Sequence, residues 1–180
     1  GVALSTVILP SLSRKFARQN PQAFSATLDW ALRLALVITL PAALGLAVLA
    51  TPILTTLFQY QAFQMSDVEM SALSLAAYAA GLPAFIAVKV LAPGFYARQD
   101  TKTPVKIAIT AMVSNMLLNL LFVGSLLAVD FQGTHMGLAL ASSAAAYINA
   151  GLLYRMLRKQ GAYDPEPGWA AVIISVGLAC

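Results

Sequence analysis

Cysteine and histidine are nearly absent from this chain of 180 residues, which contains one of each. The single Cys180 excludes a disulfide within the chain and a cysteine metal cluster, and His135 has no second ligand at a useful spacing. Paired carboxylates on an apolar face, a Ser/His/Asp set and a glycine-rich phosphate loop are also missing. The sequence therefore predicts neither a metal site nor an enzyme.

Charge is scarce as well, because only 10% of the residues are charged while 59% are apolar, and the mean hydropathy is +0.78. Soluble domains carry about a quarter charged residues. Four runs without Asp, Glu, Lys or Arg lie at 34–66, 70–88, 107–129 and 131–154, and each reaches the roughly 20 residues that a spanning helix requires. The sequence predicts an all-α protein, a polytopic transmembrane helix bundle.

Shorter apolar runs open and close the chain, at 1–13 and 167–180, and no charged segment with a cleavage site marks a signal peptide. We therefore expect residues 1–180 to form a partial transmembrane domain, a fragment of a longer membrane protein. Its helices are expected near residues 1–19, 24–49, 71–95, 103–127, 136–157 and 169–180.

Basic residues gather on alternate connections between these helices. The three clusters are Arg14, Lys15 and Arg18; Arg98, Lys102 and Lys106; and Arg155, Arg158 and Lys159. The two other connections, at 51–67 and 130–135, contain no Lys or Arg, and Asp67, Glu69 and Asp130 lie at or near them. By the positive-inside rule the three basic connections face the cytoplasm. The net charge of +4 thus indicates topology, and we expect no nucleic-acid partner.

Pro41 and Pro83 lie inside apolar helices, where each removes a backbone hydrogen bond and favours a kink. In a membrane the freed carbonyl groups need partners, so we expect these helices to pack in a bundle. The run of small residues at 137–146 predicts close packing against another helix.

Two basic residues, Arg33 and Lys89, lie inside the apolar segments at similar depth. Each is about nine residues from the cytoplasmic end of its helix, which is roughly 13 Å at 1.5 Å per residue. A charge at such a depth costs about 3 kcal/mol or more, so each one needs a reason. We expect both to face one cytoplasm-side cavity that attracts phosphate or pyrophosphate. Alternatively, Arg33 pairs with Asp29 four residues before it, and Lys89 extends toward the head groups.

Asn115 and Asn119 are four residues apart and share one face of the helix expected at 103–127. Amides in hydrocarbon seek hydrogen-bond partners on neighbouring helices, and Asn149 and Tyr147 are the expected ones. The alternative is a polar face that lines the interior or holds a cation.

The stretch VKVLAPGFYARQDTKTPVKI at 88–107 resembles a signature of the MurJ (MviN) family of bacterial lipid II flippases. The similarity covers essentially the whole chain. It continues through GVAL at 1–4, ILPSLS at 8–13, DWALRL at 29–34, LFQY at 57–60, LY at 153–154, LRKQ at 157–160 and PGW at 167–169.

This resemblance implies a fourteen-helix exporter of the multidrug/oligosaccharidyl-lipid/polysaccharide superfamily, with the present chain running from the end of helix eight to the start of helix thirteen. It implies a multi-pass protein of the bacterial inner membrane that translocates lipid II, the undecaprenyl-pyrophosphate-linked peptidoglycan precursor, by alternating access. The expected partners are lipid II, membrane lipids and the remainder of the same transporter chain.

The resemblance further implies energy from the membrane potential or from a Na⁺ or H⁺ gradient, with no bound cofactor. Some family members hold sodium with polar side chains of helices seven, eleven and twelve, and Asn115 and Asn119 lie on the expected eleventh. An amide in place of a carboxylate there weakens cation binding. Two other interpretations stay open: an exporter of another polyprenyl-linked oligosaccharide or of drugs, and a non-transporting membrane scaffold for cell-wall enzymes.

Overall fold

A computed structural model describes residues 2–58, 65–128 and 134–179, and within these ranges every regular element is an α-helix. The helices are α1 (Val2–Ala17), α2 (Pro21–Val48), α3 (Ala50–Phe58), α4 (Met65–Tyr96), α5 (Lys102–Ala128), α6 (Thr134–Lys159) and α7 (Trp169–Ala179). Four of them, α2, α4, α5 and α6, are long and apolar enough to cross a membrane. The prediction of an all-α polytopic bundle is confirmed. Gly1, Tyr60, Asp130 and Cys180 lie outside the described residues.

Most helices lie close to their expected positions, but the outer end of α2 differs from the prediction. The chain leaves α2 at Leu49 and forms the separate nine-residue helix α3, where a connection was expected. Pro52 is the physical reason, because it has no N–H for the carbonyl of Val48 and its ring clashes with that carbonyl. A proline is tolerated in the first turn of a new helix, and α3 begins two residues before it. On the other side of the gap, α4 begins at Met65 rather than near residue 71.

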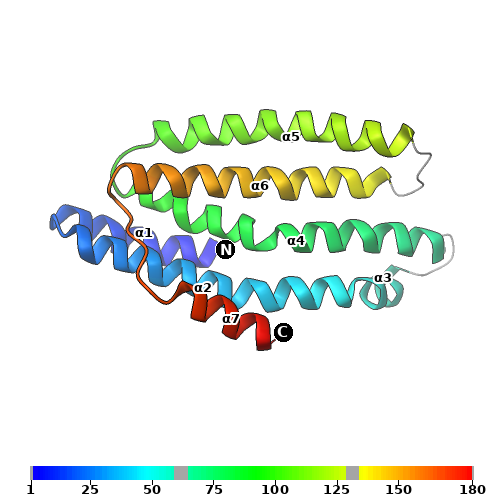
Figure 1. Ribbon diagram of the computed structural model, residues 1–180, viewed down its shortest axis with the longest axis horizontal. Coiled ribbons are helices and arrows are strands. Elements are labelled where there is room, and N and C mark those ends of the chain that lie inside the picture. Colours follow the sequence, from blue (N-terminus) through cyan, green and yellow to red (C-terminus); the bar gives the residue numbers. More distant parts are fainter. Residues whose placement is uncertain (1, 59–64, 129–133, 180) are drawn as a thin grey trace.

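The helices pack side by side in the order α5, α6, α4, α2 and α7, and α1 packs against α2 and α4 (Figure 1). The main apolar core lies where α1, α2, α4 and α6 meet. Its most deeply buried large side chains are Leu12, Leu28, Val90, Leu91, Phe95, Leu153 and Leu157. The central position of α4 lets it contact α1, α2, α3, α5 and α6, so this helix organises the bundle.

The three basic connections, at 18–20, 97–101 and 160–168, lie at the same end of the bundle (Figure 1). The other ends of α2, α4, α5 and α6, together with α3, lie at the opposite end. This arrangement agrees with helices that cross the membrane in alternating directions, with positive connections on the cytoplasmic side.

A repeated turn forms two of these connections, since Ala17-Arg18-Gln19-Asn20 and Ala97-Arg98-Gln99-Asp100 differ only in the last residue. Both glutamines adopt a left-handed backbone, with φ of 53° and 61°. In each turn two backbone N–H groups bond back to the preceding helix, from Gln19 to Phe16 and Asn20 to Lys15 in the first copy. This is the Schellman arrangement, which satisfies carbonyl groups that the helix end leaves free. The last residue then caps the next helix, because the side-chain oxygens of Asn20 and Asp100 accept from Ala23 N and Thr103 N.

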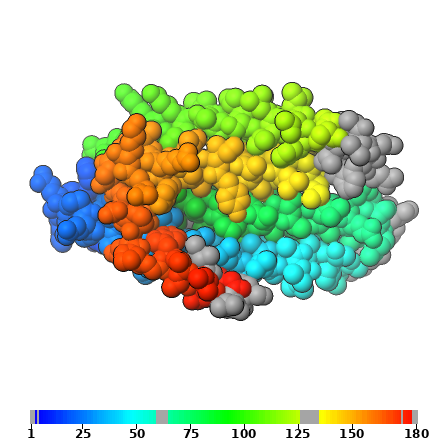
Figure 2. Space-filling model, viewed as in Figure 1, coloured from blue at the N-terminus to red at the C-terminus, as the bar shows by residue number. Residues whose placement is uncertain are grey.

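The outer face of α5 carries large apolar side chains with no cover from the described residues. Leu117, Leu120 and Leu121 are 63%, 76% and 61% exposed, and α5 forms one edge of the molecule (Figure 2). Water disfavours so continuous an apolar face, whereas lipid chains are a suitable solvent for it. The exposed face of α5 is therefore typical of a helix at the boundary between protein and lipid.

Prolines within α4 leave backbone carbonyl groups without a helical partner, and neighbouring helices supply hydrogen bonds in these regions. Pro93 removes the bond to the carbonyl of Lys89, and the hydroxyl of Ser5 on α1 donates to that oxygen at 2.7 Å. Near Pro83, the hydroxyl of Tyr147 on α6 donates to the carbonyl of Ala80 at 2.8 Å. The contact of Ser5 meets the requirement that a freed carbonyl in a membrane finds a partner, whereas that of Tyr147 lies one residue beyond the carbonyl of Ala79, which Pro83 frees.

Helices α4 and α6 pack closely at Gly81, in agreement with the close packing that the small-residue run of α6 predicted. The hydroxyl of Ser143 is buried there and donates to the carbonyl of Ala77 at 2.7 Å. A Cβ atom at position 81 would lie 2.8 Å from Ser143 Cβ and 2.9 Å from Phe85 Cε2. The absence of a side chain at Gly81 thus sets the distance between these two helices.

We predict that Gly81→Ala destabilises the protein by about 1–3 kcal/mol, the usual cost of overpacking a close helix contact. The measurement is the thermal unfolding midpoint in detergent, with the amount of protein in the membrane as a second readout. Gly45→Ala on α2 is the matched control, because a Cβ at Gly45 has no atom within 4 Å. Equal midpoints for the two variants would contradict this account of the α4–α6 contact.

Candidate functional site

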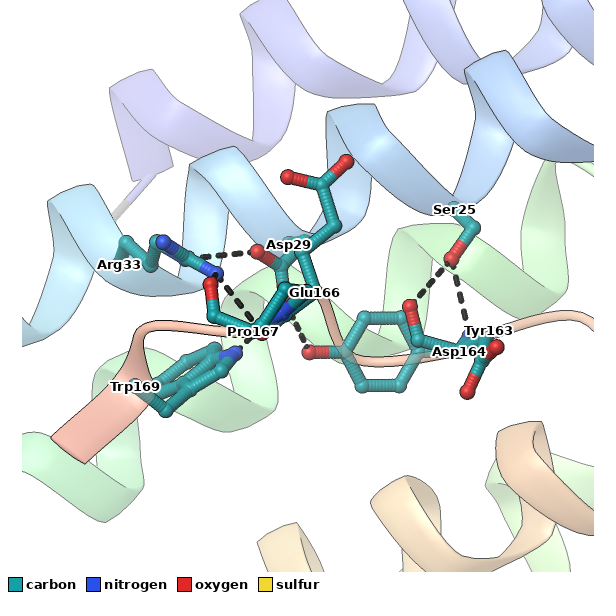
Figure 3. Close-up of polar contacts among 8 residues, drawn as sticks. All are labelled: Ser25, Asp29, Arg33, Tyr163, Asp164, Glu166, Pro167 and Trp169. Atoms are coloured by element: carbon teal, nitrogen blue, oxygen red, sulfur yellow. Dashed lines mark hydrogen bonds and ion pairs between the residues drawn. The ribbon is translucent and has the colours of Figure 1, made fainter.

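A buried carboxylate, that of Asp29 on α2, is the centre of the largest polar cluster that we find in the described residues (Figure 3). Asp29 is 1% exposed. Its Oδ1 accepts hydrogen bonds from the hydroxyl of Tyr163 at 2.6 Å and from Nε1 of Trp169 at 2.8 Å. Its Oδ2 lies 2.7 Å from Nε of Arg33. A buried carboxylate is stable only with such partners, and here two hydrogen-bond donors and one ion-pair partner supply them.

Arg33 directs its guanidinium toward the connection between α6 and α7. Its Nη2 donates to the backbone carbonyls of Glu166 at 2.9 Å and Pro167 at 3.0 Å. The guanidinium carbon also lies 5.5 Å from the centre of the Trp169 ring, within the range of a cation–π interaction. Arg33 therefore pairs with Asp29, which was the alternative interpretation of its place in an apolar helix.

Residues 160–168, here called the strap, lie along one stripe of α2. Ser25, Asp29 and Arg33 are spaced four residues apart and thus share a helix face. At the near end, the hydroxyl of Ser25 bonds both the N–H and the carbonyl of Asp164, each at 2.9 Å. At the far end, Gly168 has a φ of 105°, which a residue with a side chain rarely adopts, and there the chain turns into α7.

Tyr163 is the strap residue that reaches furthest into the protein, with 2% exposure. Burial raises the pKa of its phenol, and the hydrogen bond to the Asp29 carboxylate raises the pKa further. The hydroxyl thus keeps its proton and remains a donor to Asp29 at all physiological pH values. Its ring also packs edge-to-face on Tyr154 of α6, with the ring centres 5.6 Å apart.

Lys89 lies in a different environment, a cavity of about 430 Å³ between α4, α5 and α6. Asn115 and Asn149 line the same cavity, together with Ser142 and apolar side chains that include Phe85. The structure does not bring Arg33 and Lys89 together as expected, because Arg33 is bound to Asp29 and the strap and is not among the residues that line this cavity. The direction of the Arg33 side chain is set by its contacts with the strap and with Trp169 of α7, which are distant from Arg33 in the sequence.

The amides of α5 are only partly as expected. The side-chain oxygens of Asn115 and Asn119 are buried and accept no hydrogen bond from the residues that the structure describes. Asn149, an expected hydrogen-bond partner, lines the same cavity as Asn115, but the Asn115 oxygen accepts no hydrogen bond from it. Tyr147 does not serve as their partner, since its hydroxyl donates to Ala80 on α4 instead. Among the described ranges, no group of three His, Cys, Asp or Glu side chains is arranged to hold a metal ion.

Tyr163 and Trp169 were not predicted to belong to the Asp29 cluster. They lie 134 and 140 residues from Asp29 in the chain, so no local spacing links them to it. Two signals in the sequence could have indicated them. One is the cost of a buried charge, which requires several donors for an intramembrane carboxylate, and the other is the preference of tryptophan for membrane interfaces.

These features define a class of protein: a polytopic α-helical membrane protein with paired charges inside the bundle and a polar cavity between its helices. Comparison with known proteins is more specific. The family model described as lipid II flippase MurJ matches residues 1–180. The chain belongs to the MurJ family, and its four apolar helices make it a multi-pass protein of the bacterial inner membrane.

Three curated relatives illustrate the similarity. A probable lipid II flippase MurJ of Vibrio cholerae is 50% identical over 163 residues, which cover 91% of this chain and 30% of the relative. The lipid II flippase MurJ of Burkholderia cenocepacia is 44% identical over 99% of this chain and 34% of its own length. A probable lipid II flippase MurJ of Haemophilus influenzae is 48% identical over 99% of this chain and 35% of its own length. The chain therefore spans about a third of the length of these relatives.

A solved structure of a lipid II flippase MurJ in an inward closed conformation matches the fold with a TM-score of 0.73 at 25% sequence identity. The match covers 98% of this chain and 40% of the solved chain.

We predict that Tyr163→Phe destabilises the protein by about 1–3 kcal/mol, because it leaves a buried carboxylate one donor short while it retains the ring. Thermal or denaturant unfolding of the purified protein measures the effect. Tyr154→Phe is the control, since it makes the same chemical change on the partner ring without touching Asp29. An effect of Tyr163→Phe no larger than that of Tyr154→Phe would show that the Asp29 cluster contributes little to stability.

Proposed function

We propose that this chain forms part of a lipid II flippase, which further helices of the same polypeptide complete. The observation that carries the proposal is the 50% identity to a probable lipid II flippase over 91% of the chain. The fold match to a lipid II flippase over 98% of the chain supports it independently of any short motif. The proposed substrate is the undecaprenyl-pyrophosphate-linked precursor of peptidoglycan, moved from the inner to the outer leaflet by alternating access.

Lys89 is the residue of this chain that we assign to the substrate. Lys89 is exposed and lines the cavity between α4, α5 and α6, and none of the described carboxylates lines that cavity. An unpaired cation within an apolar helix is costly, and an anionic ligand offsets that cost. The pyrophosphate of the substrate is such a ligand, and the amides of Asn115 and Asn149 in the same cavity supply further hydrogen bonds to it. Arg33 has no part in this proposal, because Asp29 neutralises its charge.

We also propose that the transport step takes energy from the membrane potential or from a Na⁺ or H⁺ gradient. Asn115 and Asn119 form the polar face of α5 that such a step would use, since their oxygens are buried acceptors without a described partner. Collapse of the membrane potential and of each ion gradient in turn, with translocation as the readout, identifies the source.

Depletion and complementation test the function directly. The full-length gene that encodes this chain should restore lipid II translocation and cell-wall synthesis to a strain depleted of its flippase. An exporter of drugs or of another polyprenyl-linked oligosaccharide would leave translocation of lipid II unrestored. A membrane scaffold for cell-wall enzymes would do the same, so failure at a normal protein level contradicts the proposal.

We predict that Lys89→Met lowers the rate of lipid II translocation by about tenfold or more, as expected for the loss of a charged hydrogen bond worth about 1.5–3 kcal/mol. Lys89→Arg should retain most of the activity. Lys102→Met, at an exposed position outside the cavity, is the control for loss of one positive charge. Wild-type translocation by Lys89→Met at an equal membrane level would remove Lys89 from the substrate site without affecting the family assignment.

A further inference from the structure

The strap is bound to α2 at three successive levels, and the middle one is a charged cluster. Ser25 bonds the backbone of Asp164, Asp29 binds Tyr163, and Arg33 binds the carbonyls of Glu166 and Pro167. These contacts follow one stripe of α2 for two helical turns. Figure 3 shows how the strap runs beside α2 over this length. The connection between α6 and α7 is thus attached along α2 rather than free between its ends.

The carboxylate of Asp29 is what joins the three parts of this region. Its Oδ1 binds one donor from the strap, Tyr163, and one from the first residue of α7, Trp169. Its Oδ2 binds Arg33, whose guanidinium faces the same indole ring. Each of these three contacts would be weaker without the buried negative charge, because all three are made with the same carboxylate. Loss of that charge therefore weakens the contacts of Asp29 with Tyr163, Trp169 and Arg33 together.

Helix α7 has few other attachments in the part of the chain that the structure describes. Its only helix neighbour there is α2, and its side chains are mostly exposed, with Ile174 at 60%. Figure 2 shows the strap and α7 on the surface of the molecule. Pro165 and Pro167 fix φ at two positions of the strap and so limit its flexibility. Within the described residues, α7 is thus attached to the bundle through α2, and Trp169 and the strap supply polar contacts there.

We propose that Asp29 is a positioning residue that holds the strap and α7 on α2 as one rigid body throughout the transport cycle. The proposal rests on the proposed transport function, because it concerns which elements move together in alternating access. Transporters of this kind work by rigid-body motion of helix groups, and the contacts within each group determine which helices move together around the substrate site. The assignment also gives Arg33 its role, as the counter-charge of Asp29 and the donor to the far end of the strap.

The first test is to lock the strap in place. Ser25→Cys combined with Asp164→Cys, in the full-length protein without other cysteines, puts one thiol in place of a hydroxyl that lies 2.9 Å from the backbone of the residue that carries the other thiol. The disulfide should form readily in membranes and leave lipid II translocation unchanged. Each single cysteine variant is the control for the substitutions. Inhibition upon oxidation that a reductant reverses would overturn the proposal, because it would mean that the strap must leave α2 during transport.

The second test removes the charge. Asp29→Asn should reduce translocation by about tenfold or more at an equal membrane level, which is the size of effect expected for a displaced positioning contact. In the same variant, the disulfide between positions 25 and 164 should form more slowly, and once formed it should restore part of the lost activity. Asp164→Asn is the matched control, because the Asp164 side chain is exposed and only its backbone contacts α2.

A merely structural role for Asp29 would lower the amount of folded protein without rescue by the disulfide, and that result would overturn the proposal. Wild-type translocation by Asp29→Asn would overturn it as well. Failure of the wild-type protein to translocate lipid II in the same assay would reject the proposed function instead. The yield and rate of the disulfide do not depend on the substrate, so they report the position of the strap in either case.

Discussion

Hydrocarbon offers no hydrogen bonds, and this constraint explains most of the structure. Helices meet it within their own backbones, so the described chain is helical and its four longest helices are each long and apolar enough to cross a membrane. The constraint becomes demanding where a proline removes a bond. In α4, the carbonyl that Pro93 leaves free accepts from Ser5, and Tyr147 donates beside Pro83. These hydroxyl groups connect α1 and α6 to the central helix, so the kinks of α4 are also the points at which the bundle is tied together.

Charge obeys the same constraint in a stricter form, because an ionised group in the membrane requires partners of opposite charge or several hydrogen bonds. Asp29 and Arg33 meet this requirement together, with Tyr163 and Trp169 as additional donors. The result is a neutral pair that attaches a distant part of the chain. Lys89 is treated differently, since no described acidic side chain lines its cavity. The two cations thus have separate surroundings, one in an ion pair with Asp29 and one at a polar cavity.

Topology and fold class were predictable because their signals are local or additive. Nine of the eleven basic residues lie in the three clusters at alternate connections, and this pattern alone predicts which ends face the cytoplasm. The i,i+4 pair of Asp29 and Arg33 was also visible as an alternative. Its selection over a shared cavity with Lys89 was not predictable, since it depends on donors 134 and 140 residues away. The end of α2 before α3 has a local cause in Pro52, but α3 was not predicted, because the sequence on both sides of this proline is similarly apolar.

The central claim is that the helices cross the membrane in alternating directions with the three basic connections in the cytoplasm. Site-directed labelling with a membrane-impermeant maleimide tests it most directly, in spheroplasts that express the full-length protein without other cysteines and with either Glu69→Cys or Lys102→Cys. Both positions are exposed, and they lie near opposite ends of α4. We predict labelling of position 69 in intact spheroplasts and of position 102 only after permeabilisation. Labelling of both positions from the same side would contradict the alternating arrangement.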